Sequence, residues 1–299
     1  MSAVDLHVHS SFSSDGEVSP EKLIAMAKQR GLSMISIADH NNVGGVKAVA
    51  ASGNISGIKV LPGIEVDCYF NALNLHILGY GINITDPVFA DIEQNALKQE
   101  KEALPLLIRK LQSIGFHVTE EAVRRQSPNP IPVEEDIAVV LLQSPTHLDD
   151  PRLAVYRPGA GKSDMPNVHF YYDYCTRGKP AHVEKAWPDL SDVVRAVKGA
   201  GGIPVLAHPG ASLCTSSSEW RQAISLILES GVEGIECFSS YHNRKETDFF
   251  LEIAKKHGKL ITCGSDFHGR HKPAIILGAT DCRDMETDIQ RSFESLILE

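Results

Sequence analysis

Histidines and carboxylates follow apolar segments of this sequence in a combination that is typical of metal sites. The stretch "DLHVHSSFSSDGEVSP" (residues 5–20) places His7 and His9 on either side of Val8, with Asp15 six residues further on. If the segment before His9 is a strand, both imidazoles point to the same side and can reach one ion. Alone, such a pair fits a polar loop equally well, and Asp15-Gly16 is a common turn sequence.

More residues of the same kinds follow, or lie within, later apolar segments. Neutral imidazoles and carboxylates are the usual ligands of Zn, Mn and Fe, and a His/carboxylate set without cysteine is typical of a catalytic ion. A carboxylate such as Glu65 can bridge two ions. Glu65 and His76 lie inside apolar segments, where an unpaired charge is costly, so their position also favours a metal partner. The further residues are Asp39-His40, Glu65, His76, His208, and Asp266 with His268.

The segments that must position these residues read as short apolar strands alternating with helices. Strands are predicted at "AVDLHVH", "LSMISIADH" and "IKVLPGIEVDCYF", and "SPEKLIAMAKQRG" predicts a helix capped by Ser19. Such alternation favours a mainly parallel sheet or barrel. The candidate ligands come at the predicted carboxyl ends of strands, and in a parallel barrel those ends form the rim that carries the active site.

The alternation stops in the middle of the chain. Residues 87–126 predict helix throughout, with Pro105 interrupting the apolar stripe and a capping-box-like Thr119 opening "TEEAVRRQ". Residues 127–182 are rich in proline, aromatic residues and turn signals. Alternation then resumes to the end of the chain. We interpret 100–180 as an inserted, mostly helical or irregular subdomain, and a candidate lid, beside a main domain formed by 1–99 and 181–299.

Six motifs give these residues a family resemblance. "DLHVHS…SDG", "IADH", "GIEV", "HILGYG", "LAHPG" and "GSDFHG" run in order from residue 5 to residue 269. Together they resemble the PHP (polymerase and histidinol phosphatase) family, a branch of the amidohydrolase superfamily. The resemblance implies an α/β fold of the distorted (β/α)7 TIM-like barrel type and three divalent ions, which are Mn, Fe or Zn. The implied ligands are His7, His9, Glu65 and Asp266 for the first ion, Glu65, His76 and His208 for the second, and Asp15, His40 and His268 for the third.

The resemblance also implies a reaction. We expect a metal-dependent phosphoesterase that hydrolyses a phosphate ester of a small nucleotide or phosphorylated sugar, either a monoester or a cyclic diester, with a metal-bridging hydroxide as the nucleophile. Glu65 and Asp266 are the expected catalytic residues, and either His242 or a metal-bound water protonates the leaving group. The alternatives are a 5′-3′ exonuclease acting on short RNA or DNA ends and an amide or lactone hydrolase. Three ions suit a phosphate better than a carbonyl group.

Candidate residues for substrate binding are fewer. Similar family members have a GKP sequence where the insertion rejoins the barrel, so Arg177 and Lys179 of "TRGKPAH" are candidates to hold phosphate, although a plain turn explains them equally well. His242 follows a strand end and is a candidate for substrate contact. Asp39 is interpreted as a group that orients His40.

Composition limits the partners. The 299-residue chain has a formal net charge of −9, which disfavours long nucleic acid as a partner. No apolar run approaches the ~20 residues of a membrane span and no signal-peptide pattern is present, so the cytoplasm is the expected location. The oligomeric state stays open. Six isolated cysteines without a CxxC pair are expected to be reduced and mostly buried, namely Cys68, Cys175, Cys214, Cys237, Cys263 and Cys282.

Overall fold

The computed structural model describes residues 3–53, 55–71, 73–127, 130–212 and 219–298. Cys214 lies outside them, and the other five cysteines are free and buried. The strands are β1 (Val4–Val8), β2 (Met34–Ile37), β3 (Lys59–Val60), β4 (Gly63–Phe70), β5 (Leu73–Tyr80), β6 (Ile203–Leu206), β7 (Gly234–Ser239) and β8 (Leu260–Gly264). The α-helices are α1 (Pro20–Gln29), α2 (Gly44–Ser52), α3 (Val88–Ser113), α4 (Glu120–Gln126), α5 (Glu134–Gln143), α6 (Pro166–Tyr174), α7 (Leu190–Gly199), α8 (Pro209–Ser212), α9 (Glu219–Glu229), α10 (Arg244–Lys256) and α11 (Glu286–Phe293).

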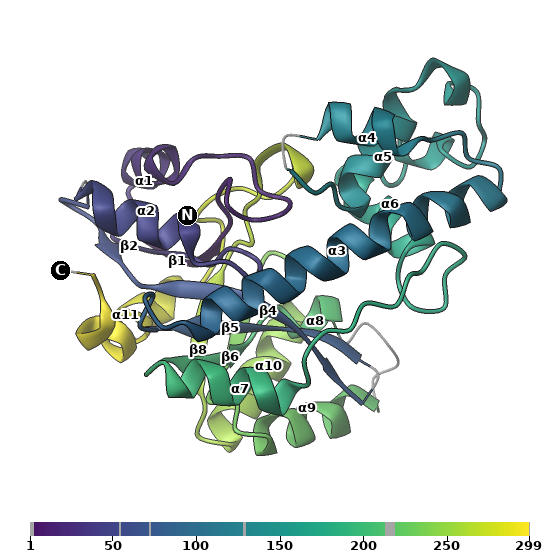
Figure 1. Ribbon diagram of the computed structural model, residues 1–299. Coiled ribbons are helices and arrows are strands. Elements are labelled where there is room, and N and C mark those ends of the chain that lie inside the picture. Colours follow the sequence, from purple (N-terminus) through teal and green to yellow (C-terminus); the bar gives the residue numbers. More distant parts are fainter. Residues whose placement is uncertain (1–2, 54, 72, 128–129, 213–218, 299) are drawn as a thin grey trace.

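The fold is α/β, with two sheets side by side (Figure 1). One sheet is parallel, in the order β1-β2-β3, and the other has the order β4-β5-β6-β7-β8. Single bridges join the sheets, from Val8 to Phe267 at one edge and from His40 to Glu65 at the other. The described strands are divided between two sheets that only these bridges connect, so the α/β class is confirmed but a single closed barrel sheet is not.

Local sequence explains the first unit. Every residue of β1 and β2 is buried, as expected of strands covered on both faces. The helix between them starts where the sequence predicts, because the Ser19 hydroxyl accepts a hydrogen bond from the Lys22 N–H (3.4 Å) and Pro20 occupies the first helical position. Gly31 follows its end with a φ of +76°, which glycine adopts without strain.

Strands β3, β4 and β5 differ from the parallel arrangement that the sequence predicts. The segment 58–70 is not one strand, since β3 and β4 lie in different sheets and Pro62, which has no N–H to donate, separates them. Strand β5 is antiparallel to both β4 and β6. Only residues 71 and 72 lie between β4 and β5, and so short a connection permits only an antiparallel pair.

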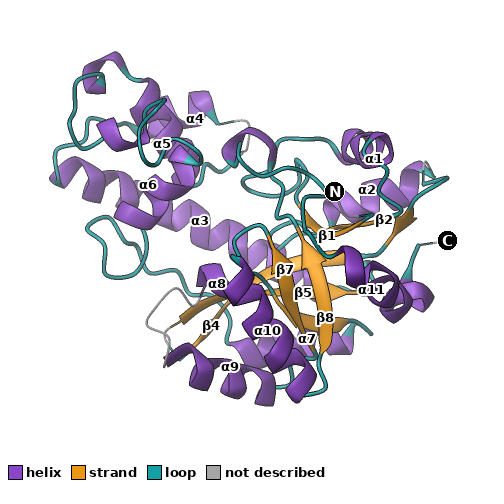
Figure 2. Ribbon diagram, turned by 180° about the vertical axis from the view of Figure 1, so that it is seen from behind, coloured by secondary structure: helices purple, strands orange, loops and turns teal. Residues whose placement is uncertain are grey.

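Helices cover the larger sheet and build its core. Figure 2 shows α7, α9 and α10 packed along the sheet that contains β4 to β8. The apolar residues of these elements form one buried cluster, with Val197, Ile235 and Phe250 fully buried. None of the helices in the described ranges combines the length and apolar character that a membrane span requires.

The middle of the chain has a hydrophobic core of its own. The long helix α3 leaves the sheets and ends beside α4, α5 and α6 at the far side of the molecule (Figure 1). Buried residues between Leu104 and Ala181 form a cluster centred on Leu111, Ile137 and Phe170. The range 87–126 is divided into α3 and α4, and α4 begins at the predicted cap, because the Thr119 hydroxyl accepts a hydrogen bond from the Ala122 N–H (3.2 Å). Pro105 lies inside α3 without ending it, and the break comes near Gly115, which has a φ of +90°.

Candidate metal centre

The nine predicted ligands lie together at one edge of the two sheets. Their ligand atoms fall into three groups, and within each group the atoms lie within 4.8 Å of one another. Asp67, which was not predicted, is a tenth member of the cluster. These groups differ from the implied ligand sets, because His9 falls with Asp15, His208 falls with His7, and His76 falls with His40 and Asp67. The groups are His9, Asp15, His40 and His268; His7, Glu65, His208 and Asp266; and His40, Asp67 and His76.

Strand geometry explains the convergence and corrects one expectation. His7 and Asp266 do lie at carboxyl ends of parallel strands, but Glu65 is the third residue of β4 and His76 lies in the middle of β5. His76 reaches the same edge because β5 runs antiparallel and pairs it with Asp67 of β4. The Nε2 of His76 lies 3.0 Å from the Asp67 Oδ1.

The Nε2 atoms of His7 and His9 face each other. His7 Nδ1–H donates to Glu236 Oε1 (3.0 Å), since a carboxylate only accepts. The Ser13 hydroxyl donates to Asp15 (2.8 Å), so His9 Nδ1–H must donate to Ser13 (3.1 Å). In the neutral imidazoles that bind a metal, both Nε2 atoms are then unprotonated, and they lie only 3.1 Å apart. Lone pairs this close repel unless a metal ion or a proton lies between them.

Carboxylate oxygens surround the same two nitrogens. Glu65 Oε2 lies 3.1 Å from His7 Nε2 and 3.2 Å from His9 Nε2, and Asp266 Oδ1 lies 3.3 Å and 3.0 Å from them. The other oxygen of Glu65 lies 3.0 Å from a nitrogen of His76 and 3.0 Å from a nitrogen of His208. Glu65 therefore stands between two sets of imidazoles, as a bridging ligand does.

The third group gathers around Asp15. The Asp15 Oδ2 lies 2.9 Å from His268 Nε2 and 3.9 Å from His40 Nε2. His268 Nδ1–H donates to the Asp266 carbonyl (2.8 Å), which leaves His268 Nε2 as a lone pair aimed at Asp15. In the neutral His268, the Nε2 atom and the Asp15 Oδ2 are therefore two acceptors that face each other.

The donor set fits divalent cations. Four buried atoms of the cluster have no hydrogen-bond partner among the described residues, although buried polar atoms are nearly always paired. His208 and Asp266 have positive φ values of 24° and 60°, an uncommon conformation for residues other than glycine and one that is found at functional sites. The unpartnered atoms are His40 Nδ1, Glu65 Oε2, Asp266 Oδ1 and His268 Nε2.

The carboxylates stay ionised despite burial. Burial raises the pKa of Glu65, but His7, His40 and His76 outweigh it and hold this pKa well below its usual range. Burial likewise raises the pKa of Asp15 and Asp266. The neighbouring histidines outweigh burial at Asp15, and Lys272 and the histidines outweigh it at Asp266, so both pKa values are well below the usual range. Without bound cations the histidines must supply the compensating charge. Burial lowers the pKa of His7, but Glu65, Glu236 and Asp266 outweigh it and hold this pKa well above the usual value.

Residues behind the ligands hold them in place. Glu236 is fully buried, and while one oxygen accepts from His7, the other accepts from the His208 N–H (2.8 Å). Asp39 was expected to orient His40, but its carboxylate accepts from the Ser10 N–H (2.6 Å) and the Ser10 hydroxyl (2.7 Å). Asp39 therefore fixes the loop after His9. The Asp67 N–H donates to Asn41 Oδ1 (3.1 Å), and the Asn41 amide donates to Asp67 in return.

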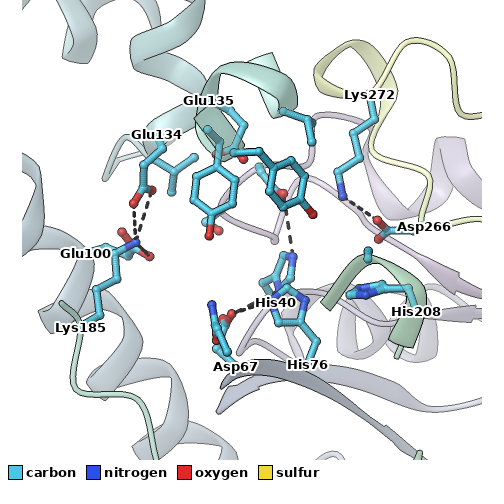
Figure 3. A pocket seen from close by; sticks show the side chains of 18 of the residues that line it. His40, Asp67, His76, Glu100, Glu134, Glu135, Lys185, His208, Asp266 and Lys272 are labelled. Carbon is cyan, nitrogen blue, oxygen red and sulfur yellow. Dashed lines mark hydrogen bonds and ion pairs between the residues drawn. The ribbon is translucent and has the colours of Figure 1, made fainter. Parts of the chain in front are cut away.

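A pocket opens over the cluster, between the sheets and the inserted segment (Figure 3). On the side of Asp266, Lys272 lies 2.6 Å from the Asp266 Oδ2, which also accepts from the Tyr241 hydroxyl (2.7 Å). Other lining residues come from the inserted segment and its return to the main domain. These are Glu100, Val133, Glu134, Glu135, Val168, Tyr171, Tyr172, Lys185 and Trp187.

The predicted substrate-binding residues lie elsewhere. His242 does not line this pocket, since its Nδ1–H donates to the Cys237 carbonyl (2.9 Å) and its Nε2 accepts from the Gly210 N–H (2.9 Å). With both nitrogens bonded to backbone, His242 has no proton to offer a leaving group. Arg177 is exposed and pairs with Glu184, and the exposed Lys179 also lies outside the pocket.

Sequence reasoning missed Glu236, Asp67, Lys272 and the pocket residue Lys185. Glu236 and Asp67 did carry a signal, because each is an acidic residue within an apolar strand ("GIECF" and "IEVDCYF"), where an unpaired charge is costly. The two lysines gave no such signal. Each follows a turn-rich segment, and only the fold brings them to the pocket.

Comparisons with known proteins identify the family. The model of the PHP domain matches residues 5–144. The 3′,5′-nucleoside bisphosphate phosphatase of Chromobacterium violaceum is 31% identical over 303 residues, covering 100% of this chain and 99% of that protein. The chain belongs to the PHP family. The phosphoribosyl 1,2-cyclic phosphate 1,2-diphosphodiesterase of Eggerthella lenta is also similar, with 27% identity over 89% of this chain and 94% of that protein.

A solved structure agrees with this PHP assignment. An amidohydrolase from Chromobacterium violaceum, solved with bound sulfate, matches with a TM-score of 0.79 and 28% identity. The match covers 99% of this chain and 98% of that one, so the inserted segment is included.

Proposed function

We propose that this PHP protein is a metal-dependent phosphoesterase that hydrolyses the phosphate ester bond of a small nucleotide or phosphorylated sugar. The observation that carries the proposal is the set of facing lone pairs, in which two Nε2 atoms 3.1 Å apart share the oxygens of Glu65 and Asp266. The similarity to a bisphosphate phosphatase and to a cyclic phosphodiesterase supports the reaction class.

Three divalent ions would be held within the three groups of candidate ligands, divided as the family resemblance implies. His7, His9, Glu65 and Asp266 would hold the first, Glu65, His76 and His208 the second, and Asp15, His40 and His268 the third. Bound there, such ions supply a water of lowered pKa and neutralise phosphate oxygens. Mn, Fe and Zn all suit imidazole and carboxylate ligands.

The residues of the chain supply the remaining parts of the site. Lys272, buried beside Asp266, places a positive charge at the side of the pocket where the reacting phosphate would lie, and a positive charge there stabilises the transition state. The hydroxyl of Tyr241 and Lys272 both hold the outer oxygen of Asp266, so its inner oxygen faces His7 and His9. Tyr171 and Trp187 offer ring surfaces for the leaving part of the substrate.

At the level of the fold, the proposal is that the two sheets are the two parts of a distorted (β/α)7 barrel, held by the bridges at Val8 and His40. Residues 1–99 and 181–299 would form this domain and 100–180 the inserted subdomain. The separate core of the insertion and its contribution of Glu134 and Tyr171 to the pocket support a role as a lid.

A substrate screen tests the function. The purified protein supplied with Mn²⁺ would be incubated with nucleoside monophosphates, sugar phosphates and ribose cyclic phosphates, and released phosphate or opened ring would be measured. Turnover of at least one class is expected. Hydrolysis of lactones or amides with no phosphoester turnover would contradict the proposal, and turnover confined to short RNA would favour the exonuclease alternative.

A further inference from the structure

The side of the pocket away from Asp266 and Lys272 is closed by a buried ionic triad (Figure 3). Lys185 Nζ lies 2.8 Å from Glu100 Oε1 and 3.0 Å from Glu134 Oε1. The three side chains are only 11%, 16% and 10% exposed, respectively. Burial lowers the pKa of Lys185, but the two carboxylates outweigh it and hold this pKa well above the usual value, so the lysine stays charged. One ammonium group between two ionised carboxylates leaves a formal charge of −1, and because burial raises the pKa of Glu100 to about 7, this charge is complete above that pH.

The pocket contains no spare positive charge. Among the described residues that line it there is no arginine, and the only lysines are Lys185 and Lys272. Arg177 lines an adjoining pocket beside Trp187, but it is already paired with Glu184. Lys185 is bound by Glu100 and Glu134, and Lys272 is bound by Asp266 on the side of the metal ligands. A phosphate group usually needs arginine, lysine or free backbone N–H groups to replace its hydration.

The amino end of α5 does not serve as a phosphate site either. This helix begins at the pocket, but its first three residues are Glu134, Glu135 and Asp136. Asp136 Oδ2 accepts from the Val133 N–H (3.1 Å), so a side chain of the helix already occupies one of the free donors. Ionised carboxylates at a helix amino end satisfy the positive end of its dipole and repel a second anion, and Glu134, paired with Lys185, supplies one. Burial raises the pKa of Glu135 to about 8, so this side chain adds its negative charge only at higher pH.

Resting on the proposed function, we propose that the pocket selects substrates with a single phosphoryl group and a neutral or amine-bearing leaving part, and rejects bisphosphates. The reacting phosphate lies at the metal ligands and Lys272. The leaving part lies against the rings of Tyr171 and Trp187 and reaches Glu134, where hydroxyl or amino groups can donate to carboxylates. A second phosphate would meet the same carboxylates and be repelled. The similar protein from Chromobacterium violaceum is named a bisphosphate phosphatase, so the preference proposed here is the opposite of the one that its name states.

Matched substrate pairs test the selection directly. Adenosine 3′-monophosphate would be compared with adenosine 3′,5′-bisphosphate, and fructose 6-phosphate with fructose 1,6-bisphosphate, because the members of each pair differ only in the second phosphate. For any pair that is turned over, kcat/KM for the monophosphate should exceed that for the bisphosphate by about tenfold or more, since like charges placed together cost several kcal/mol.

Two variants connect this ratio to the triad. Glu134→Gln leaves Lys185 paired with Glu100 alone and makes the remaining pair neutral. It should reduce the preference severalfold, mainly through a lower KM for the bisphosphate. The control is Glu121→Gln, which removes an equal charge from the outer face of α4, where Glu121 is exposed and pairs with Arg125. The control should leave the ratio unchanged, and thermal melting would verify that both variants fold.

The outcomes separate the two claims. A wild-type preference for the bisphosphate, or an equal change of the ratio in both variants, overturns the selection while phosphoesterase activity stands. Absence of turnover on every phosphoester in the screen overturns the proposed function itself.

Discussion

At the scale of single residues, the centre depends on which nitrogen of each imidazole carries the proton. Glu236 controls this choice for His7, because its carboxylate can only accept and therefore keeps the proton on Nδ1. Its second oxygen accepts from the backbone of His208. One buried carboxylate thus orients two ligands from two different strands, although it would bind no metal itself.

Replacing Glu236 by glutamine tests this role. The amide puts a donor where one of two bonds needs an acceptor, so either His7 or the His208 backbone loses its partner. Metal affinity should fall by about 10–100-fold, the range for loss of a residue that supports a ligand. Equilibrium dialysis followed by elemental analysis measures it. Glu233→Gln, at the exposed start of the same segment and paired with Lys198, is the control, and equal affinities in both variants would contradict the role.

Glu135 gives a pH prediction. Burial, and then the nearby carboxylates of Glu134 and Asp15, raise the pKa of Glu135 to about 8. Because the folded-state pKa lies above the unfolded value of 4.5, its contribution to stability is complete below that value and is lost as pH rises toward 8. In chelator, the melting temperature of Glu135→Gln relative to wild type should therefore rise between about pH 5 and about pH 8.5. A difference that does not depend on pH would contradict this prediction.

The sequence located the ligands better than the residues around them. His7, His9 and Glu65 were predicted as ligands because histidines and acids at strand ends suggest metal ligands, and the fold places their side chains close together. Arg177 was a candidate because of its charge and its place in a motif, but the fold directs it to Glu184 in solvent. Lys272 was missed because a lysine after a turn is ordinary, and only the packing of its segment against Tyr241 gives it a role.

At the scale of elements, the close approach of β8 to β1 sets the position of the first ligands. Gly264 ends β8, and a Cβ atom placed there would lie 2.1 Å from the Cβ of His7 and 2.3 Å from Glu236 Oε1. No side chain fits between the two strands at this point. The glycine of "GSDFHG" therefore lets His7 and its supporting carboxylate meet.

Gly264→Ala should displace His7 or Glu236. We expect destabilisation of about 1–3 kcal/mol, as for overpacked cores, together with weaker metal binding. The matched control is Gly199→Ala at the end of α7, where an added Cβ meets nothing within 4 Å. Chemical denaturation and metal titration measure both effects, and two variants of equal stability and affinity would contradict the expected clash.

Elements were predictable where local signals decide them. The helix after Ser19 and the strand before His9 follow from caps and apolar runs. The direction of β5 did not follow, because the apolar pattern of a strand does not depend on its direction. The two-residue connection after β4 was the available signal. The start of α4 did follow from its cap at Thr119, whereas the apolar stripe alone did not show that α3 ends near Gly115.

At the scale of the whole molecule, the inserted segment turns an exposed cluster of ligands into a pocket. Its core packs independently of the sheets, and yet α5 and α6 place Glu134 and Tyr171 opposite the ligands. A net charge of −9 agrees with small substrates, since the positive charges at the centre are local and mostly paired. On the proposed function, two separate units would bind the substrate, with the reacting phosphate at the sheets and the leaving part at the insertion.

The most direct measurement of the central claim is the metal content per chain, together with phosphoester turnover, in wild type and Glu65→Gln. Glu65 lies within reach of His7, His9, His40, His76 and His208, so its loss should remove the two ions that share it. Wild type should bind about three ions, one for each proposed set of ligands. Glu65→Gln should bind at most one ion, and its turnover should be lowered at least about a hundredfold. Full metal content and full activity in Glu65→Gln would contradict the account.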